Sequence, residues 1–347
     1  MIDIIQVLGI AFFVLIGTYL LVPLNIRLSN RWGIIALPSE RKIHKLARPE
    51  AGGLSFAILI VIAQAIVGFL HSSEFIGQAL LKLSAVGIVA IVLGVIDDKY
   101  DSKARYKFLG QICLGIIMYI IGYRVHSLTN PMGSDFILGW MSFPITVIWY
   151  LVMINAINLI DGIDGLACGI TIIVSAILLV VGIREQNILA ITLSSLLMAG
   201  NLGFIRYNFF PAKIFMGDTG SLFIGLNIAA IATAGSSQYK GITTMTLMIP
   251  ISVMAIPLID VLLAVSRRIK DGNLFKADRA HLHHTMLDFG LSQRAISIIV
   301  YIATFLFGLI AIGFSFSSKK ILFSVLLGLM TIMVIVAYIL MRQEDKK

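Results

Sequence analysis

The sequence predicts an all-α polytopic membrane protein, and three observations support that class. Hydrophobic residues make up 59% of the 347 residues and charged residues only 13%. Apolar windows of about 20 residues, long enough for a helix to cross a bilayer, recur along the whole chain. Lys and Arg are concentrated in alternate connections between those windows. A soluble protein with a large core does not combine these features, so we expect one integral membrane domain over residues 1–347.

Eleven windows are long and apolar enough to be interpreted as membrane-spanning helices. They cover residues 4–23, 51–70, 80–96, 108–123, 136–154, 166–183, 188–205, 221–235, 242–265, 295–316 and 321–341. The signal is weakest at 108–123 and 221–235. The first window has no basic residues before it and is too long for the core of a signal peptide, so we expect it to be retained.

The positions of Lys and Arg predict the orientation. The connections at 24–50, 97–107, 155–165, 206–220 and 266–294, with the tail 342–347, hold 21 of the 27 basic residues. Basic loops usually face the cytoplasm, which places the N-terminus outside and the C-terminus in the cytoplasm. Most of the net charge of +9 reflects this bias, and the remainder favours anions such as lipid phosphates or nucleotides at the cytoplasmic face.

A polar stretch separates the windows 136–154 and 166–183. Asn155, Asn158 and Asp161 are spaced by three, which on a helix keeps them on one stripe, and Asp164 follows them. A turn that caps the next helix is the simplest alternative, but a cap needs only one such side chain. Ionisable groups at a bilayer edge are costly, so this stretch is a candidate functional site.

Two further connections carry carboxylates. Asp97 and Asp98 end the window 80–96, where adjacent acids need a cation or a basic partner; a solvated loop with internal ion pairs is the alternative. In the connection 206–220, Asp218 lies in Gly-Asp-Thr-Gly-Ser directly before a window. We expect a tight turn there, followed by a helix N-terminus whose N–H groups favour phosphate, although an ordinary turn would use the same residues.

Two other connections are basic and contain histidine. His44 precedes Gly52 and Gly53, whose backbone N–H groups predict an anion-binding turn. The last large connection contains Asp-Arg-Ala-His-Leu-His-His at 278–284. Three histidines at this spacing, with neither Cys nor an adjacent Glu, make a poor zinc site, whereas imidazoles beside an arginine suit a diphosphate or nucleotide.

The carboxylates and amides together suit Mg²⁺, which binds oxygen ligands and keeps several waters or substrate phosphates. The set comprises Asp97, Asp98, Asn158, Asp161, Asp164 and Asp218. Basic groups around such a metal indicate phosphoryl transfer, in which positioning and charge neutralisation supply most of the catalysis.

Four motifs, in the same order from about Arg41 to Arg294, resemble those of the polyprenyl-phosphate N-acetylhexosamine-1-phosphate transferases (glycosyltransferase family 4). They are Asp97-Asp98-x-x-Asp101, Asn155-x-x-Asn158-x-x-Asp161-Gly-x-Asp164-Gly-Leu, Asn208-x-x-Pro-Ala-Lys-x-Phe-Met-Gly-Asp218-x-Gly-Ser and Asp278-Arg-x-His281-x-His283-His284. Any one of them alone would be weak evidence, but four in register are specific.

The resemblance implies transfer of N-acetylglucosamine-1-phosphate from UDP-N-acetylglucosamine to undecaprenyl phosphate, with Mg²⁺ or Mn²⁺ as cofactor. The products would be undecaprenyl-diphosphate-N-acetylglucosamine and UMP, in the first step of a cell-envelope polysaccharide such as lipopolysaccharide or teichoic acid. The protein would lie in the bacterial cytoplasmic membrane. The histidine motif is similar to that of the N-acetylglucosamine branch and differs from that of the muramoyl-pentapeptide branch; another UDP-N-acetylhexosamine donor is the alternative.

The resemblance also implies roles for individual residues. Asp218 and Asp98 would bind the metal, and Asp97 would be the base or the contact to the acceptor phosphate, all three in the catalytic centre. The residues implied in substrate binding are His44, Lys107, Asn155, Asn158, Asp161, Asp164, Asn208, Arg279, His281, His283 and His284.

Two other classes of protein are alternatives to a transferase. A cation-coupled transporter would place carboxylates near the membrane midplane in broken, repeated helices, whereas these lie at the cytoplasmic ends of spans. A non-catalytic lipid-binding protein leaves the metal-type set of carboxylates unexplained. We therefore expect a UDP-sugar, undecaprenyl phosphate and the bilayer as partners and no nucleic acid, with a homodimer through an apolar helix face as a further expectation.

Overall fold

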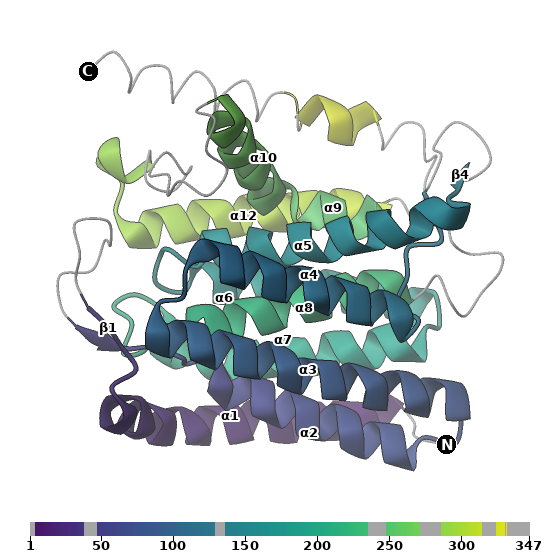
Figure 1. The fold of residues 1–347 in the computed structure, drawn as a ribbon, viewed down its shortest axis with the longest axis horizontal. Coiled ribbons are helices and arrows are strands. Elements are labelled where there is room, and N and C mark those ends of the chain that lie inside the picture. Colours follow the sequence, from purple (N-terminus) through teal and green to yellow (C-terminus); the bar gives the residue numbers. More distant parts are fainter. Residues whose placement is uncertain are drawn as a thin grey trace.

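The structure is a computed structural model that describes residues 4–37, 47–128, 136–234, 248–270, 286–313, 324–329 and 331. Figure 1 shows long helices packed side by side, most of them with nearly parallel axes. The long helices are α1 (Ile4–Trp32), α2 (Leu54–Leu70), α3 (Glu74–Tyr100), α4 (Ala104–Ile120), α5 (Ser142–Ile160), α6 (Leu166–Arg184), α7 (Ile188–Asn208), α8 (Gly217–Ala234), α10 (Ala255–Lys270) and α12 (Gln293–Gly313).

The remaining elements are short. Helix α9 covers Met248–Val253, and a 3₁₀ turn, η1, covers Gly139–Met141. Strands β1 (Ile35–Ala36) and β2 (Arg48–Pro49) pair antiparallel, as do β3 (Ser127–Leu128) and β4 (Phe136–Ile137). These strand pairs lie in the connections between helices. The described part of the protein is mostly helical, as predicted.

Six of the described helices are long and apolar enough to cross a membrane. They are the segments Ile5–Trp32, Glu74–Tyr100, Gly139–Ile160, Leu166–Arg184, Ile188–Asn208 and Gln293–Gly313. The protein is therefore a multi-pass membrane protein, whereas the number of eleven spans and the orientation stay predictions.

The ends of several helices differ from the predicted windows. Helix α3 continues to Tyr100 and α5 to Ile160, because the polar residues that ended the apolar windows occupy the last helical turns. Most of the candidate site residues that the structure describes consequently lie near helix ends, and not in the connections between the predicted windows.

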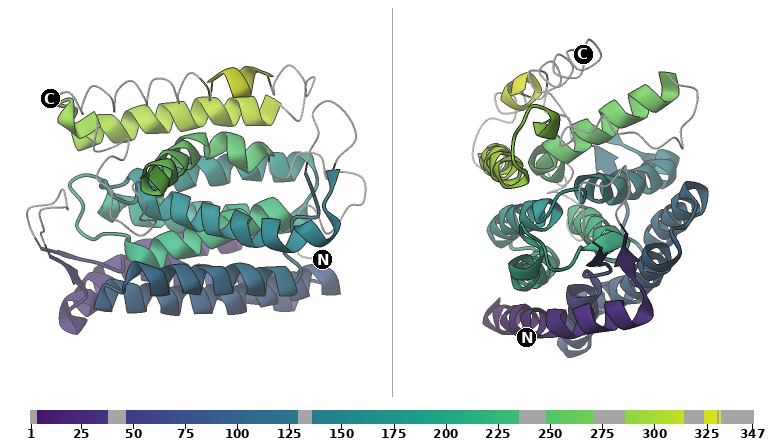
Figure 2. Two further views of the ribbon diagram at one scale, coloured as in Figure 1. Left: turned by 45° about the horizontal axis from the view of Figure 1, so that its top comes forward. Right: turned by 90° about the vertical axis from the view of Figure 1, so that its left-hand side faces the viewer.

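The predicted window 242–265 is not one continuous helix in its described part, which forms α9 and α10 with a break at Met254. Pro257, in the first turn of α10, has no N–H to bond to the carbonyl of Val253, so one continuous helix would lose that bond. Helix α10 runs obliquely to the other helices (Figures 1 and 2).

Helix α8 is the buried centre of the bundle, packed against α2, α3, α5 and α7. Its N-terminal turn is held closely by two glycines. A Cβ on Gly94 of α3 would lie 2.3 Å from Cα of Thr219, and a Cβ on Gly53, before α2, would lie 2.1 Å from Cα of Gly220. Small residues let helix backbones approach this closely in membranes, and the start of α8 is thereby placed against the end of α3.

Candidate active site

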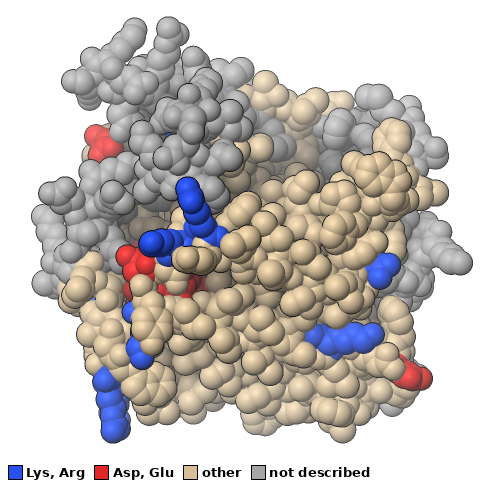
Figure 3. All heavy atoms as spheres, in the orientation of Figure 1, with Lys and Arg blue, Asp and Glu red and all other residues tan. Residues whose placement is uncertain are grey.

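The candidate site forms at one end of the bundle, where α3 and α5 end and α4 and α8 begin. Asp97 and Asp98 lie in the last turn of α3 and Lys107 in the first turn of α4. Asn158 lies in the last turn of α5, and Asp218 is the second residue of α8. Figure 3 shows acidic side chains gathered beside basic ones at this end of the molecule.

Lys107 bridges two carboxylates. Its Nζ lies 2.5 Å from Oδ2 of Asp218 and 3.2 Å from Oδ2 of Asp97, and the three side chains are 11–20% exposed. Charge-assisted hydrogen bonds of this kind are stronger than neutral ones. Asp97 and Asp218 therefore converge on a point that holds a cation.

The second oxygens of these two carboxylates differ in their surroundings. Asn158 donates through Nδ2 to Oδ1 of Asp218 and to Oγ of Ser221, the latter at 2.9 Å. Oδ1 of Asp97 is buried and has no hydrogen-bond partner among the described residues. An unpartnered buried carboxylate oxygen is costly, so Asp97 has an acceptor available for a substrate group.

Asp98 is directed toward α8. Its Oδ1 accepts a hydrogen bond from the N–H of Asp218 at 2.6 Å, and its Oδ2 accepts from N–H and Oγ1–H of Thr219 at 3.0 and 2.5 Å. The sequence predicted that the N–H groups of this helix terminus would favour a substrate phosphate. For Asp218 and Thr219 that prediction was wrong, because the anion they bind is the carboxylate of Asp98.

The two carboxylates of the α5–α6 connection have different environments. The pKa of Asp161 is raised well above its usual range, first by burial and then by the negative charges of Asp218 and Asp98. Asp161 therefore belongs to the acidic cluster. Asp164 accepts hydrogen bonds from Nη1 of Arg48 at 3.0 Å and from the N–H of Ala212 at 2.8 Å, so it joins three connections at this end of the bundle.

Asn155 and Asn208 bind protein groups beside the cluster. Asn155 donates through Nδ2 to Oε1 of Gln111 on α4 at 2.7 Å, and Asn208 donates to the carbonyl of Ile214 at 3.1 Å. They hold α4 against α5 and shape the connection before α8, and their contacts to substrate stay predictions.

The predicted anion-binding turn at Gly52 and Gly53 was wrong. Their N–H groups donate to the carbonyls of Phe215 and Met216, at 2.8 and 2.9 Å, so this turn is paired with the segment that leads into α8. Several other candidates lie outside the described residues, namely His44, Arg279, His281, His283 and His284.

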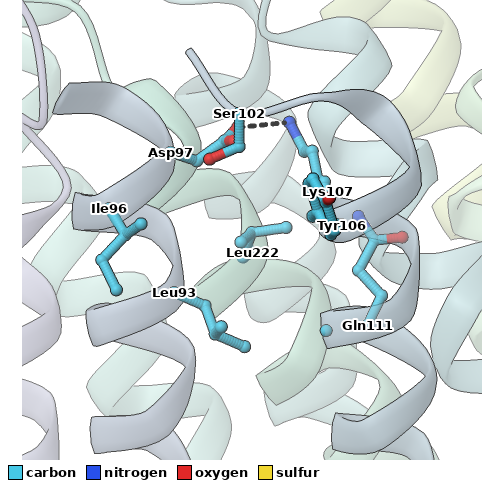
Figure 4. A pocket seen from close by; sticks show the side chains of 9 residues that line it. Leu93, Ile96, Asp97, Ser102, Tyr106, Lys107, Gln111 and Leu222 are labelled. Atoms are coloured by element: carbon cyan, nitrogen blue, oxygen red, sulfur yellow. Dashed lines mark ion pairs between the residues drawn. The ribbon is translucent and has the colours of Figure 1, made fainter. Parts of the chain in front are cut away.

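A pocket of about 110 Å³ opens beside the cluster between α3, α4 and α8. Figure 4 shows Asp97 and Lys107 facing each other at its polar end, with Leu93, Ile96 and Leu222 along its apolar part. A polar mouth joined to an apolar wall suits an amphiphile whose phosphate lies beside the cluster.

Sequence reasoning overlooked several residues that contact this cluster or line the pocket, among them Gln111, Ser221 and Thr219. Gln111 lies four residues after Lys107 on α4, and Ser221 lies three residues after Asp218 on α8, so each shares a helix face with a recognised candidate. These helical spacings could have identified Gln111 and Ser221 from the sequence. The contact of Thr219 with Asp98 had no signal in the local sequence.

The pair Arg48–Asp164 leads to a testable prediction about stability. Arg48→Gln should lower the free energy of unfolding by about 1–3 kcal/mol, because it leaves a largely buried carboxylate without its ionic partner. Thermal unfolding in detergent measures the effect, with Arg31→Gln at an exposed position of α1 as the matched control. Equal melting temperatures for the two variants would show that the pair contributes nothing.

The fold and the site together define a multi-pass membrane protein with carboxylates and a lysine gathered at one end of its helices. Comparison with known families gives the class: the model of glycosyl transferase family 4 matches residues 80–236, the part that carries most of the cluster.

Comparison with individual proteins extends this match over most of the chain. The chain is 38% identical over 306 residues, 87% of its length, to 84% of the probable undecaprenyl-phosphate N-acetylglucosaminyl 1-phosphate transferase of Bacillus subtilis. It is 31% identical over 315 residues, 82% of its length, to 77% of the decaprenyl-phosphate N-acetylglucosaminephosphotransferase of Mycobacterium leprae. A phospho-N-acetylmuramoyl-pentapeptide-transferase of Clostridium botulinum is 33% identical over 237 residues, 65% of this chain and 71% of the relative. The chain therefore belongs to glycosyl transferase family 4, which favours the transferase interpretation over the transporter and lipid-binding alternatives.

Proposed function

We propose that the protein transfers N-acetylglucosamine-1-phosphate from UDP-N-acetylglucosamine to undecaprenyl phosphate, forming undecaprenyl-diphosphate-N-acetylglucosamine and UMP. The observation that carries the proposal is the convergence of Asp97, Lys107 and Asp218 beside a pocket with an apolar wall. The names of the Bacillus and Mycobacterium relatives specify this kind of donor group and a polyprenyl phosphate. The lipid product would begin a cell-envelope polysaccharide.

The position of the cluster suits two substrates that arrive by different routes. The acceptor phosphate is anchored in the bilayer by its polyprenyl chain, and the nucleotide comes from the cytosol, so the reacting phosphates meet at the membrane surface. Lys107 lies where it can neutralise a phosphate once one of its two carboxylates releases it. Asn158 fixes the Asp218 side chain from the opposite side.

The donor set fits Mg²⁺, with Mn²⁺ as the alternative. No group of three or more Asp, Glu, His or Cys side chains that could hold a metal occurs in the part of the chain that the structure describes. Mg²⁺ does not need such a group, because it commonly binds one or two carboxylates and takes its other ligands from water and substrate phosphates. Asp218 would hold the ion, which would neutralise the diphosphate charge that develops during transfer.

The other residues of the site have separate proposed roles. Asp97 presents Oδ1, which has no hydrogen-bond partner in the part of the chain that the structure describes, to the acceptor phosphate, either as the base or as an orienting contact. Asp161, whose pKa is raised by burial and by its acidic neighbours, lies where the nucleotide or metal would be held. Arg279 and the histidines at 281, 283 and 284 are proposed to bind the donor diphosphate.

An assay with purified protein tests the proposal. Radiolabelled UDP-N-acetylglucosamine and undecaprenyl phosphate should give a labelled lipid and an equal amount of UMP, and EDTA should stop both. UDP-N-acetylgalactosamine and UDP-N-acetylmuramoyl-pentapeptide, supplied separately, test the choice of donor. Labelled lipid formed only from one of these would replace the proposed donor, and transfer from none of them would overturn the proposed function.

The proposed orientation gives a second prediction. With Cys113 and Cys168 replaced by serine, Lys103→Cys and Lys213→Cys should react with a membrane-impermeant maleimide only after the cells are permeabilised. Ser72→Cys, in the α2–α3 connection, should react in intact cells. All three positions are exposed. The opposite pattern would place the acidic cluster outside the cytoplasm and contradict both the orientation and the use of a cytosolic nucleotide.

The homodimer expected from the sequence stays a prediction. The outer faces of α1 and α3 carry exposed apolar side chains such as Phe13 and Ile88. Contact with bilayer lipid requires the same kind of apolar surface, so these side chains do not by themselves indicate a dimer.

A further inference from the structure

Asp97 and Asp98 are adjacent in the sequence but have different partners. Successive residues on a helix point about 100° apart, so the two side chains leave α3 in different directions. Asp97 contacts Lys107 at the site, whereas Asp98 accepts three hydrogen bonds from the first turn of α8.

The contact made by Asp98 is a helix cap supplied by another helix. The first N–H groups of any helix lack partners within it and are usually satisfied by a side chain just before the helix. In α8 the residue at the start is Gly217, which has no side chain and has a positive φ of 72°. The carboxylate of Asp98 takes the place of the missing cap, and its charge is favourable at a helix N-terminus.

The surrounding backbone is built for this contact. A Cβ on Gly217 would lie 2.6 Å from Oδ2 of Asp98, and a Cβ on Gly94, one turn before Asp98, would lie 2.3 Å from Cα of Thr219. Two glycines therefore allow α3 and α8 to meet where the carboxylate is held. Thr219 is fully buried, and its hydroxyl donates to Asp98.

We infer that Asp98 and Thr219 form a positioning pair that fixes the first turn of α8, and with it the Asp218 carboxylate, for metal and donor binding. The inference rests on the proposed function for the role of Asp218. Three donors from α8 surround the Asp98 oxygens, so Asp98 acts through the backbone that carries Asp218, and not as a second metal ligand.

Melting temperatures without metal distinguish a positioning residue from a ligand. In EDTA, Asp98→Asn should lower the melting temperature by about 3–10 °C, because an amide cannot accept all three hydrogen bonds and lacks the charge favoured at the helix terminus. A residue that only binds metal would have the opposite effect, since removing one of several crowded carboxylates relieves repulsion when no cation is present. Asp97→Asn is the matched comparison and should change the melting temperature much less. An unchanged or raised melting temperature for Asp98→Asn in EDTA would overturn the inference.

Substitutions of Thr219 test the pair without touching a carboxylate. Thr219→Val removes the hydroxyl and keeps the backbone N–H bond, and it should raise the Mg²⁺ concentration for half-maximal UMP release by about 10-fold, the scale for residues that orient a metal ligand. Thr219→Ser should restore the Mg²⁺ requirement, because it keeps the donor.

Thr233→Val provides a control on the same helix. Thr233 is also buried, bonds to Tyr150 and lies 14 residues further along α8, about 21 Å from Thr219. It should lower the melting temperature and leave the Mg²⁺ requirement unchanged. An equal increase in Mg²⁺ requirement for both valine variants, or none for Thr219→Val, would overturn the pair. The melting experiment needs no substrate, so failure of the proposed function leaves it decisive.

Discussion

Asp218→Asn should abolish turnover and, with it, the part of donor binding that depends on Mg²⁺. The amide would replace an anionic ligand by a neutral one. Lys107 and Asn158 each donate to a different oxygen of Asp218, and the NH₂ group that replaces one of these oxygens cannot accept a hydrogen bond. We expect a loss of about 10³-fold in kcat, the upper end of the range for removing one electrostatic stabiliser.

Binding of UDP-N-acetylglucosamine to the purified variant, with and without Mg²⁺, measures the first effect, and release of UMP measures the second. Asp288→Asn is the matched control, because it makes the same chemical change at an exposed position. An inactive Asp218→Asn variant whose donor affinity still increased normally with Mg²⁺ would remove Asp218 as the metal ligand.

Much of the site could be predicted because its residue types are unusual at the ends of apolar helices. Carboxylates and amides there have few structural explanations, and the structure places Asp97, Asp98, Asn158 and Asp218 in one cluster with Lys107. The chemistry of the residues identified the carboxylates and Asn158, whereas Lys107 was identified through the resemblance to the family.

The arrangement within the cluster could not be predicted in the same way. The spacing by three suggested that Asn155, Asn158 and Asp161 form one stripe, but α5 ends at Ile160 and Asp161 lies in the following turn. The side-chain amide of Asn155 also donates a hydrogen bond to Gln111 of the neighbouring helix α4. The spacing of residues predicts the direction of their side chains only as far as the helix continues. It does not show which neighbouring helix lies in that direction.

The same limit explains Asp98. The resemblance implied that Asp98 binds the metal beside Asp97, whereas the 100° rotation between successive helical residues directs the two side chains to different neighbours. Its partner, the start of α8, is 120 residues away in the sequence. By contrast, the break at Met254 had a visible cause in Pro257, and the hydropathy windows passed over it because they average across a proline.

Asp97→Asn should fail in a different way from Asp218→Asn. The variant should keep binding the donor and Mg²⁺, because Asp218, Asn158 and Asp98 retain their mutual contacts. Turnover should fall by about 10²- to 10⁴-fold, the usual contribution of a positioned general base. The buried Oδ1 of Asp97, to which no described residue donates a hydrogen bond, is the acceptor that the substitution removes or replaces with a donor.

Single-turnover release of UMP from donor bound beforehand isolates this step, because binding is complete before undecaprenyl phosphate is added. A lower rate at saturating acceptor would indicate that Asp97 acts in the transfer itself, and a rate restored by excess acceptor would indicate that it mainly binds the acceptor phosphate. Full turnover by Asp97→Asn under all conditions would exclude both roles. Among the described residues that line the pocket, the charged contact that remains would then be Lys107, whose ion pair with Asp218 survives the substitution and leaves an ammonium group beside the phosphate.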